Sequence, residues 1–197
     1  NQLSVILFLM LIFPLKILAG VQVGATAPNF ELESSKGEKF LLSDYKDKLV
    51  VLEWTNHQCP YVRKHYRTRN MQKLQKKYRQ KGVVWFSVIS SSKGRQGHVS
   101  SSKANDLTES RDAHPTAVLI DESGKVGRLY GARTTPHMYI VNKGELAYMG
   151  AIDSIPTSDQ DDLKDAKNYV AAALDEILAG KEVSTTKSRP YGCSVKY

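Results

Sequence analysis

Three short, almost continuous apolar runs constrain the fold of this chain more than any other feature of its sequence. They are Leu49–Leu52, Val83–Ile89 and Thr116–Ile120. Runs of this length without polar alternation are typical of strands that are buried on both faces of a sheet. Segments in which apolar residues follow a helical spacing come after them, at 63–81, 103–111 and 125–130. Strands that alternate with helices in this way predict an α/β domain.

Further strands and a final helix extend this pattern at both ends. Paired strands around short polar turns are predicted at residues 30–32 with 39–42, and at residues 137–141 with 145–149. A long helix is predicted over Asp161–Leu178, where Gly180 ends it. We therefore predict a central mixed sheet with helices on both faces and an N-terminal β-hairpin as an extension.

The positive charge of the chain is concentrated in one of these helical segments. The formal net charge is +8, and residues 63–81 hold nine basic side chains and no acid, so the rest of the chain carries −1. The pattern predicts an amphipathic surface helix with a solvated, lysine-rich face. A nucleic-acid-binding stripe is the alternative. We expect no nucleic-acid partner, because no aromatic RNA-binding signature, zinc finger or helix-turn-helix spacing accompanies the charge.

Composition narrows the class of protein further. The chain has 197 residues, of which 41% are hydrophobic and 24% charged, as in an ordinary soluble domain. Two cysteines are too few for a disulfide-stapled small fold or for an all-thiolate zinc site. These values exclude a disordered chain and a protein that crosses a membrane many times.

The first twenty residues are predicted to be a targeting segment. An unbroken apolar run at Val5–Phe13 is followed by the small residues Ala19 and Gly20, which predicts a signal peptide over residues 1–20. An uncleaved anchor over residues 3–23 is the alternative, and only this form would contact a membrane. Pro14 and Lys16, inside the segment, favour cleavage. Either form places the folded part outside the cytoplasm, periplasmic or secreted, where disulfides persist.

Cys59 occupies the position in the chain that is best suited to chemistry. It stands between a buried strand and a helix, with Pro60 at the first helical position, where a missing N–H is tolerated. The free N–H groups of a helix N-terminus favour a thiolate over a thiol, and Arg63 and His57 add positive or switchable charge. We interpret Cys59 as a nucleophile; the alternative is a small buried hydrophobic residue.

The sequence around Cys59 resembles the active-site corner of the redoxins, the thioredoxin and peroxiredoxin superfamily of AhpC/TSA type. Residues 54–62, Trp-Thr-Asn-His-Gln-Cys-Pro-Tyr-Val, are most similar to a bacterial peroxiredoxin-like branch with an Asn-His-x-Cys-Pro-aromatic-Val motif. The similarity continues at residues 24–30, 42–45, 50–52, 134–136 and 189–196. It implies a thioredoxin-like redoxin domain over residues 21–182, a tail over 183–197 that carries Cys193, and no cofactor.

The resemblance also implies roles for individual residues. Glu53, six residues before Cys59, is similar to the buried carboxylate that passes protons in thioredoxins; the alternative is an edge carboxylate paired with a lysine. Peroxiredoxins place a threonine where this chain has Asn56, so Asn56 or Thr55 is the candidate donor to a peroxide. Arg133 is a candidate to meet the thiolate, and a plain surface arginine is the alternative.

Substrate binding is assigned by the same resemblance to the two loops that would flank Cys59. The residues are His57, Pro60, Thr135 and Pro136. Pro136 is expected to be a cis-proline that faces Cys59, and Thr135 to offer its backbone to an extended substrate chain. His57, Cys59 and His137 form a conceivable metal set, but their spacing is not that of a standard site, so we expect no metal.

The function implied is that of an extracytoplasmic thiol oxidoreductase. Cys59 would attack a peroxide oxygen or a disulfide sulfur, and a thiol reductant would restore it. Val62 replaces the second cysteine of a Cys-x-x-Cys motif, and the other thiol is Cys193. We predict a reversible Cys59–Cys193 disulfide, within one chain or between two; the alternative is a structural Cys193 on a tail packed far from the site. A non-catalytic binding or metal-carrying module of the same fold is the alternative function.

Overall fold

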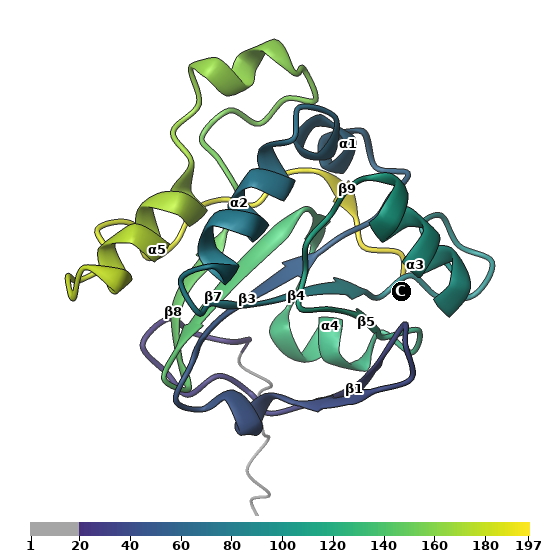
Figure 1. The fold of residues 1–197 in the computed structure, drawn as a ribbon, viewed down its shortest axis with the longest axis horizontal. Helices are drawn as coiled ribbons and strands as arrows, with labels where there is room; N and C mark the ends of the chain where they lie inside the picture. Colours follow the sequence, from purple (N-terminus) through teal and green to yellow (C-terminus); the bar gives the residue numbers. More distant parts are fainter. Residues whose placement is uncertain (1–19) are drawn as a thin grey trace, which may run out of the picture.

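The computed structural model describes residues 20–197, which fold around a seven-stranded sheet (Figure 1). The predicted signal peptide therefore lies outside the described residues, except for Gly20. In spatial order the strands are β2 (Lys39–Leu41), β1 (Glu31–Ser34), β5 (Ala117–Ile120), β4 (Val84–Ile89), β3 (Leu49–Trp54), β7 (His137–Asn142) and β8 (Glu145–Gly150).

The sheet is mixed, as the sequence predicts. β3, β4 and β5 are parallel to one another, and β7 and β8 continue the sheet from β3 as an antiparallel hairpin. The N-terminal hairpin joins the same sheet, because β1 pairs antiparallel with β5. The three continuous apolar runs thus become the three central strands, which are buried on both faces.

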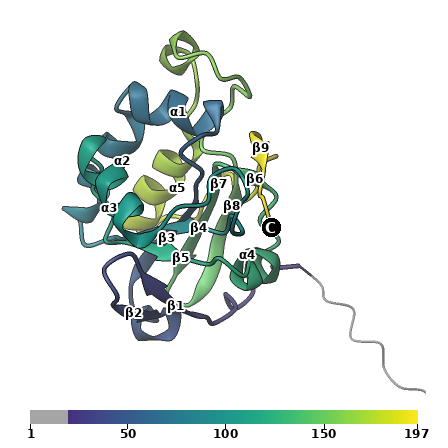
Figure 2. The same cartoon turned by 90° about the vertical axis from the view of Figure 1, so that its right-hand side faces the viewer.

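Helices cover both faces of the sheet (Figures 1 and 2). One face carries α1 (Pro60–Arg67), α2 (Asn70–Arg79), α3 (Ser101–Ser110) and α5 (Tyr169–Leu178), and the other carries α4 (Lys125–Tyr130). No helix within residues 20–197 combines the length and the apolar character needed to cross a membrane.

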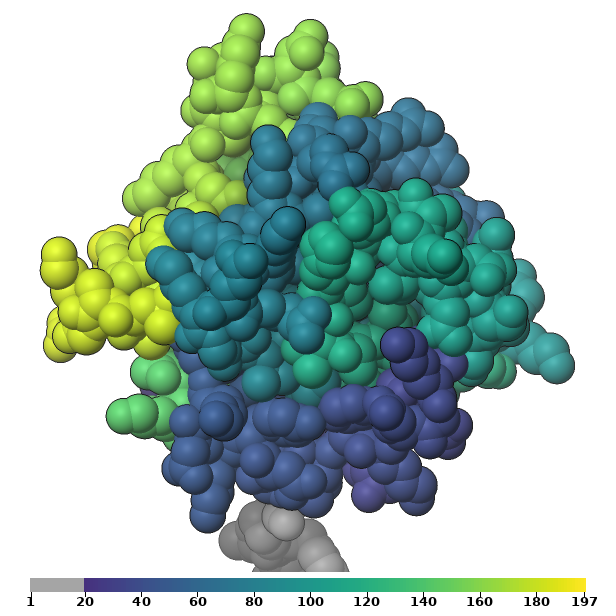
Figure 3. Space-filling model, in the orientation of Figure 1, coloured from purple at the N-terminus to yellow at the C-terminus, as the bar shows by residue number. Residues whose placement is uncertain are grey.

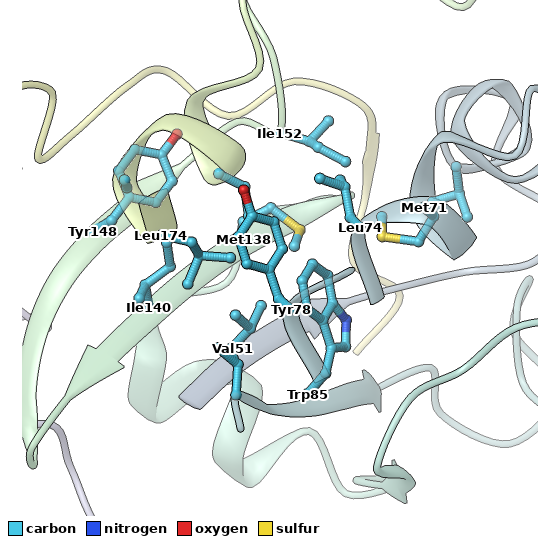
Figure 4. Close-up of a cluster of buried hydrophobic side chains, with 14 of the residues drawn as sticks. Val51, Met71, Leu74, Tyr78, Trp85, Met138, Ile140, Tyr148, Ile152 and Leu174 are labelled. Carbon is cyan, nitrogen blue, oxygen red and sulfur yellow. The ribbon is translucent and has the colours of Figure 1, made fainter. Parts of the chain in front are cut away.

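Two hydrophobic clusters fix the strands in place, one on each face. On the first face, Val51 and Trp85 of the sheet pack against Leu74 and Tyr78 of α2 and Leu174 of α5 (Figure 4). Complete burial of such side chains contributes about 1.5–3 kcal/mol each. The cluster on the opposite face includes Leu52, Trp54, Phe86, Val126 and Tyr130. Because β3 is held from both sides, the loop that follows it and carries Cys59 starts from a rigid point.

The prediction of one long basic helix over residues 63–81 is wrong. Two helices, α1 and α2, replace it, and Arg69 between them has a left-handed backbone with φ 62°. The side-chain hydroxyl of Thr68 donates to the backbone carbonyl of Lys64. Hydrogen bonds of this kind, from a side chain to the nearby backbone, compete with the backbone bonds of a continuous helix. Lys64 is also not on a solvated face: its side chain is buried and lies 3.6 Å from Asp153.

The predicted helix over residues 161–178 is too long. Residues 161–164 form a 3-10 turn, and α5 begins only at Tyr169. Asn168 caps the N-terminus of α5, because its side-chain oxygen accepts from the backbone N–H of Ala171. The backbone N–H of Lys167 donates to the hydroxyl of Ser154. It is therefore not available for a helical hydrogen bond, and the residues before Asn168 stay outside α5.

The C-terminal tail is built into the domain and is not a loose extension. Its short strand β9 (Cys193–Ser194) pairs antiparallel with β6 (Thr134–Thr135). Backbone bonds join Met149 to Thr186, Arg133 to Val195 and Ser92 to Lys196. The hydroxyl of Tyr197 donates to the carbonyl of Ala132. The alternative in which the tail packs on the far side from Cys59 is therefore wrong.

Candidate active site

Cys59 lies at the expected corner and is fully enclosed. It is the N-cap of α1, directly before Pro60, and its side chain is 0% exposed. Its thiol donates to the carbonyl oxygen of Thr135, with Sγ and oxygen 3.0 Å apart. The backbone N–H of Cys193 donates to the same sulfur at 3.4 Å. The sulfur therefore contacts one group from the predicted substrate loop and one from the tail.

The loop opposite Cys59 has the expected geometry, because the Thr135–Pro136 peptide bond is cis. Thr135 pairs with Cys193 in the β6–β9 ladder. Gly192 makes this close approach feasible: its φ is 135°, and a Cβ there would lie 2.1 Å from the Thr135 oxygen. The tail thus pairs with the backbone that was predicted to hold an extended substrate.

Cys193 is next to Cys59, and both are free thiols. Burial, together with the hydrogen bond and charge of Cys59, raises the pKa of the Cys193 thiol to about 11. Cys193 is therefore protonated at neutral pH while Cys59 is reduced. The Cys193 backbone therefore lies beside the Cys59 sulfur, and a disulfide between the two residues stays a prediction.

Glu53 is buried in the central strand β3, so the alternative of an edge carboxylate paired with a lysine is wrong. Burial raises its pKa, although four side chains that donate to the carboxylate oppose the shift. These donors are Tyr66, Gln75, Trp85 and Ser87. They belong to the helices and strand beneath the active-site loop, and the transfer of a proton from Glu53 to Cys59 remains a prediction.

Asn56 and Thr55 do not present their donors to Cys59. The Asn56 amide oxygen accepts from the N–H of Gln58, and its nitrogen donates to the carbonyl of Gln96. Asn56 therefore shapes the loop. Thr55 lines a small cavity, and its buried hydroxyl has no hydrogen-bond partner within residues 20–197.

The remaining predicted site residues occupy different surroundings. His57 is half-buried and lines two cavities beside α1 and α3, whereas Pro60 is exposed. The exposed side chain of Arg133 lines another cavity, with Met149 and Lys187. The structure therefore groups Cys59 with Thr135, Pro136 and Cys193, and within residues 20–197 no hydrogen bond joins it to Arg133.

The histidine proposed as part of a metal set is also engaged elsewhere. His137 is buried, and its Nδ1 accepts from the backbone N–H of Arg133 and contacts the hydroxyl of Tyr139. Burial, and then the charge of Arg133, lower the pKa of His137 to about 3. Among residues 20–197, no three His, Cys, Asp or Glu side chains converge in a way that would hold a metal ion.

A buried polar cluster that the sequence did not reveal anchors the tail. Tyr191 donates to Asp153, and Asp153 in turn lies 3.6 Å from Lys64 and 3.8 Å from His65. Lys64 also donates to the carbonyls of Ile155 and Thr157. Its partners are far apart in the sequence, from 38 residues for Tyr191–Asp153 to 91 for Lys64–Ile155 and 126 for His65–Tyr191, so no local motif marks this cluster.

The fold and this site define the class of the chain: it has the thioredoxin fold, with a cysteine at a strand-to-helix corner opposite the Thr135–Pro136 loop. The model of the AhpC/TSA family matches residues 23–149, and the chain belongs to this family. The prediction of a redoxin with a thioredoxin-like fold is thereby confirmed.

Individual proteins are similar to this chain in sequence or in structure. The thioredoxin-like protein YneN of Bacillus subtilis is 32% identical over 125 residues, which is 63% of this chain and 68% of that protein. An uncharacterised conserved protein from Geobacillus kaustophilus has a similar structure, with a TM-score of 0.75, 26% identity and coverage of 89% and 92% of the two chains. The thioredoxin domain of a thiol-disulfide oxidoreductase from Bacteroides vulgatus shares the fold, with a TM-score of 0.52, 19% identity and coverage of 74% and 97%.

Proposed function

We propose that this protein is a thiol–disulfide oxidoreductase whose redox pair is Cys59 and Cys193. The observation that carries the proposal is the contact between them: the Cys193 N–H lies 3.4 Å from Cys59 Sγ, on a strand paired to the residues before the cis-proline. Cys193, which follows Cys59 by 134 residues in the sequence, takes the place of the missing second cysteine of a Cys-x-x-Cys motif.

The reaction consists of two exchanges. The Cys59 thiolate attacks one sulfur of a substrate disulfide, so that a new S–S bond forms and the other half leaves as a thiolate. Cys193 then loses its proton and attacks Cys59, which releases the second substrate thiolate and leaves a Cys59–Cys193 disulfide. The substrate gains two electrons and the protein loses two, and an external thiol reductant returns them.

Disulfide exchange fits the site better than peroxide reduction does. The resemblance to peroxiredoxins assigns Asn56 or Thr55 to a peroxide and Arg133 to the thiolate. Here Asn56 bonds its own loop, and Thr55 and Arg133 each line a different cavity. Membership of the AhpC/TSA family makes peroxide reduction the second candidate. In that reaction Cys59 takes one peroxide oxygen as a sulfenic acid, water or an alcohol leaves, and Cys193 displaces a second water.

A substrate must displace the tail before it reaches Cys59. The sulfur is fully buried, and the backbone edge beside it is already paired with β9. The tail strand β9 therefore occupies the position that a substrate strand would take. It yields to a substrate strand and returns when Cys193 attacks.

We also propose that the protein is exported. The apolar run at 5–13 and the small residues after it support this proposal, since they follow the pattern of a signal peptide. Sequencing the N-terminus of the protein isolated from its own host tests it. A start near Val21 in a periplasmic or secreted fraction is expected, and an intact N-terminus in a cytosolic fraction would contradict it.

The redox function is tested by trapping its intermediate. Reduced wild-type protein and the variants Cys59→Ser and Cys193→Ser are each mixed with glutathione disulfide or hydrogen peroxide, and their masses are measured. We expect Cys193→Ser to accumulate a mixed disulfide on Cys59, while the wild type loses both thiols. A sulfenic acid that forms much faster with peroxide would establish the second candidate. Unchanged thiols with both oxidants would support a non-catalytic module.

A further inference from the structure

A second cavity, beside the active-site loop, is surrounded by arginines. It measures about 580 Å³ and is lined by His57 and by four arginines, Arg63, Arg67, Arg69 and Arg111. These side chains come from α1, from the turn after it and from the C-terminal end of α3. The blue surface of α1 and α2 meets the green surface of α3 on the face shown in Figure 3.

Most of this positive charge has no partner in the protein. Arg69 forms an ion pair with Asp112. Arg63, Arg67 and Arg111 have no ion-pair partner in the part of the chain that the structure describes. Four arginines around one hollow repel one another, so an anion placed there would relieve that repulsion.

One of these arginines is held ready in a fixed position. The guanidinium of Arg111 lies 4.9 Å from the centre of the Tyr66 ring and donates to the carbonyl of His57 at 3.2 Å. Because the guanidinium contacts the Tyr66 ring through its flat face, the N–H groups at its edge that do not bond His57 can bind a planar, bidentate acceptor such as a carboxylate. The side chain therefore loses little freedom when an anion binds.

The arginine cavity adjoins a smaller chamber of about 40 Å³. His57, Tyr66 and Arg111 line both. The chamber also contains the hydroxyl of Thr55, which is buried and unpartnered within residues 20–197. A buried hydroxyl without a partner is costly unless a ligand or a water molecule bonds it. The unpartnered hydroxyl of Thr55 is a second sign that the region receives a polar ligand.

The arginine cavity is close to the reactive cysteine along the chain. His57 lies two residues before Cys59, and the backbone N–H of Arg63 donates to the Cys59 carbonyl at 2.9 Å. Arg67 follows one helical turn later on the same side of α1. A molecule bound by these arginines is therefore held beside the first turn of α1.

We propose that this arginine cavity binds the carboxylates of a small anionic disulfide that reacts at Cys59, an inference that rests on the proposed function. The class of substrate is a low-molecular-weight disulfide with two or more carboxylates. Arg63, Arg67 and Arg111 hold the carboxylates, and the S–S bond extends toward the loop of His57 and Cys59.

Two disulfides that differ in charge test the proposal. The rate of mixed-disulfide formation in a Cys193→Ser background is measured with dianionic 3,3′-dithiodipropionate and with neutral bis(2-hydroxyethyl) disulfide. We expect Arg67→Gln to slow the dianion by about twofold to fivefold and to leave the neutral disulfide unchanged. Lys73→Gln removes the same charge from the exposed side of α2 and is expected to change neither rate. Equal losses for both disulfides, or no loss for either, would overturn the inference.

A binding measurement separates this inference from the redox function. Suberate has the shape of 3,3′-dithiodipropionate with the sulfurs replaced by carbon, so it binds without reacting. Titration of the full chain with suberate is followed through the NMR signals of the arginine side chains. Shifts confined to Arg63, Arg67 and Arg111 support the site even if neither disulfide reacts. Absence of shifts, with both disulfides reacting equally, would reject the site and keep the redox function.

Discussion

Replacement of Gly192 by alanine is expected to lift the tail from Cys59 and expose the buried sulfur. Gly192 lies directly over the Thr135–Pro136 backbone, and an added Cβ would be 2.1 Å from the Thr135 oxygen, 2.8 Å from its carbonyl carbon and 3.3 Å from the Pro136 nitrogen. The first two neighbours are backbone atoms of a buried residue, so the tail must move instead.

The size of the effect follows from this geometry. Separation of the Cβ and the oxygen to 3.0 Å or more moves the tail by nearly 1 Å, which takes the Cys193 N–H beyond its 3.4 Å contact with Cys59. A φ of 135° adds strain for any residue with a side chain. Strain of this kind costs on the order of 1–3 kcal/mol, which corresponds to about 5- to 150-fold more of the open form.

The assay is the rate at which iodoacetamide alkylates Cys59, measured by peptide mapping so that Cys193 is scored separately. Gly82→Ala serves as the control, because Gly82 has a similarly unfavourable φ of 84° but nothing within 4 Å of an added Cβ. We expect faster alkylation of Cys59 in Gly192→Ala only. If both variants and the wild type react at one rate while remaining folded, the tail is not what encloses Cys59.

Three further predictions concern charge. Asp153→Asn should lower the free energy of unfolding by about 3–5 kcal/mol, because Lys64 would stay buried without its counter-ion; an unchanged urea midpoint would show that Lys64 is solvated. Alkylation of Cys193 should rise with pH to a midpoint near 11, and Cys59→Ser should lower that midpoint. Stability should fall as pH drops from 6.5 toward 3, where only the unfolded chain protonates His137, and a flat profile would refute this.

The sequence predicted those parts of the structure that depend on local patterns. Continuous apolar runs marked the central strands, because burial on both faces excludes polar alternation. The strand-to-helix corner at Cys59 was readable because Pro60 marks the first helical position. The cis-proline opposite it was readable only through resemblance to a family, since no local pattern distinguishes Pro136 from other prolines.

What the sequence could not predict depends on contacts between distant residues. A buried Lys64 looks like any lysine of a basic helix until Asp153, 89 positions later in the numbering, is seen beside it. The start of α5 depends on Asn168, whose capping role competes with an otherwise helical apolar pattern. The path of the tail was left open because pairing of β9 with β6 joins residues about 60 positions apart, Thr134 with Ser194 and Thr135 with Cys193.

The central claim is that Cys59 and Cys193 form one redox pair within one chain. The most direct test is peptide mapping without reductant after the reduced protein has met a stoichiometric amount of glutathione disulfide. The account predicts a cross-linked peptide that joins Cys59 to Cys193, recovered from protein that migrates as a single chain. Recovery of Cys59 as a lasting mixed disulfide or an oxidised sulfur acid, with Cys193 still open to alkylation, would contradict it.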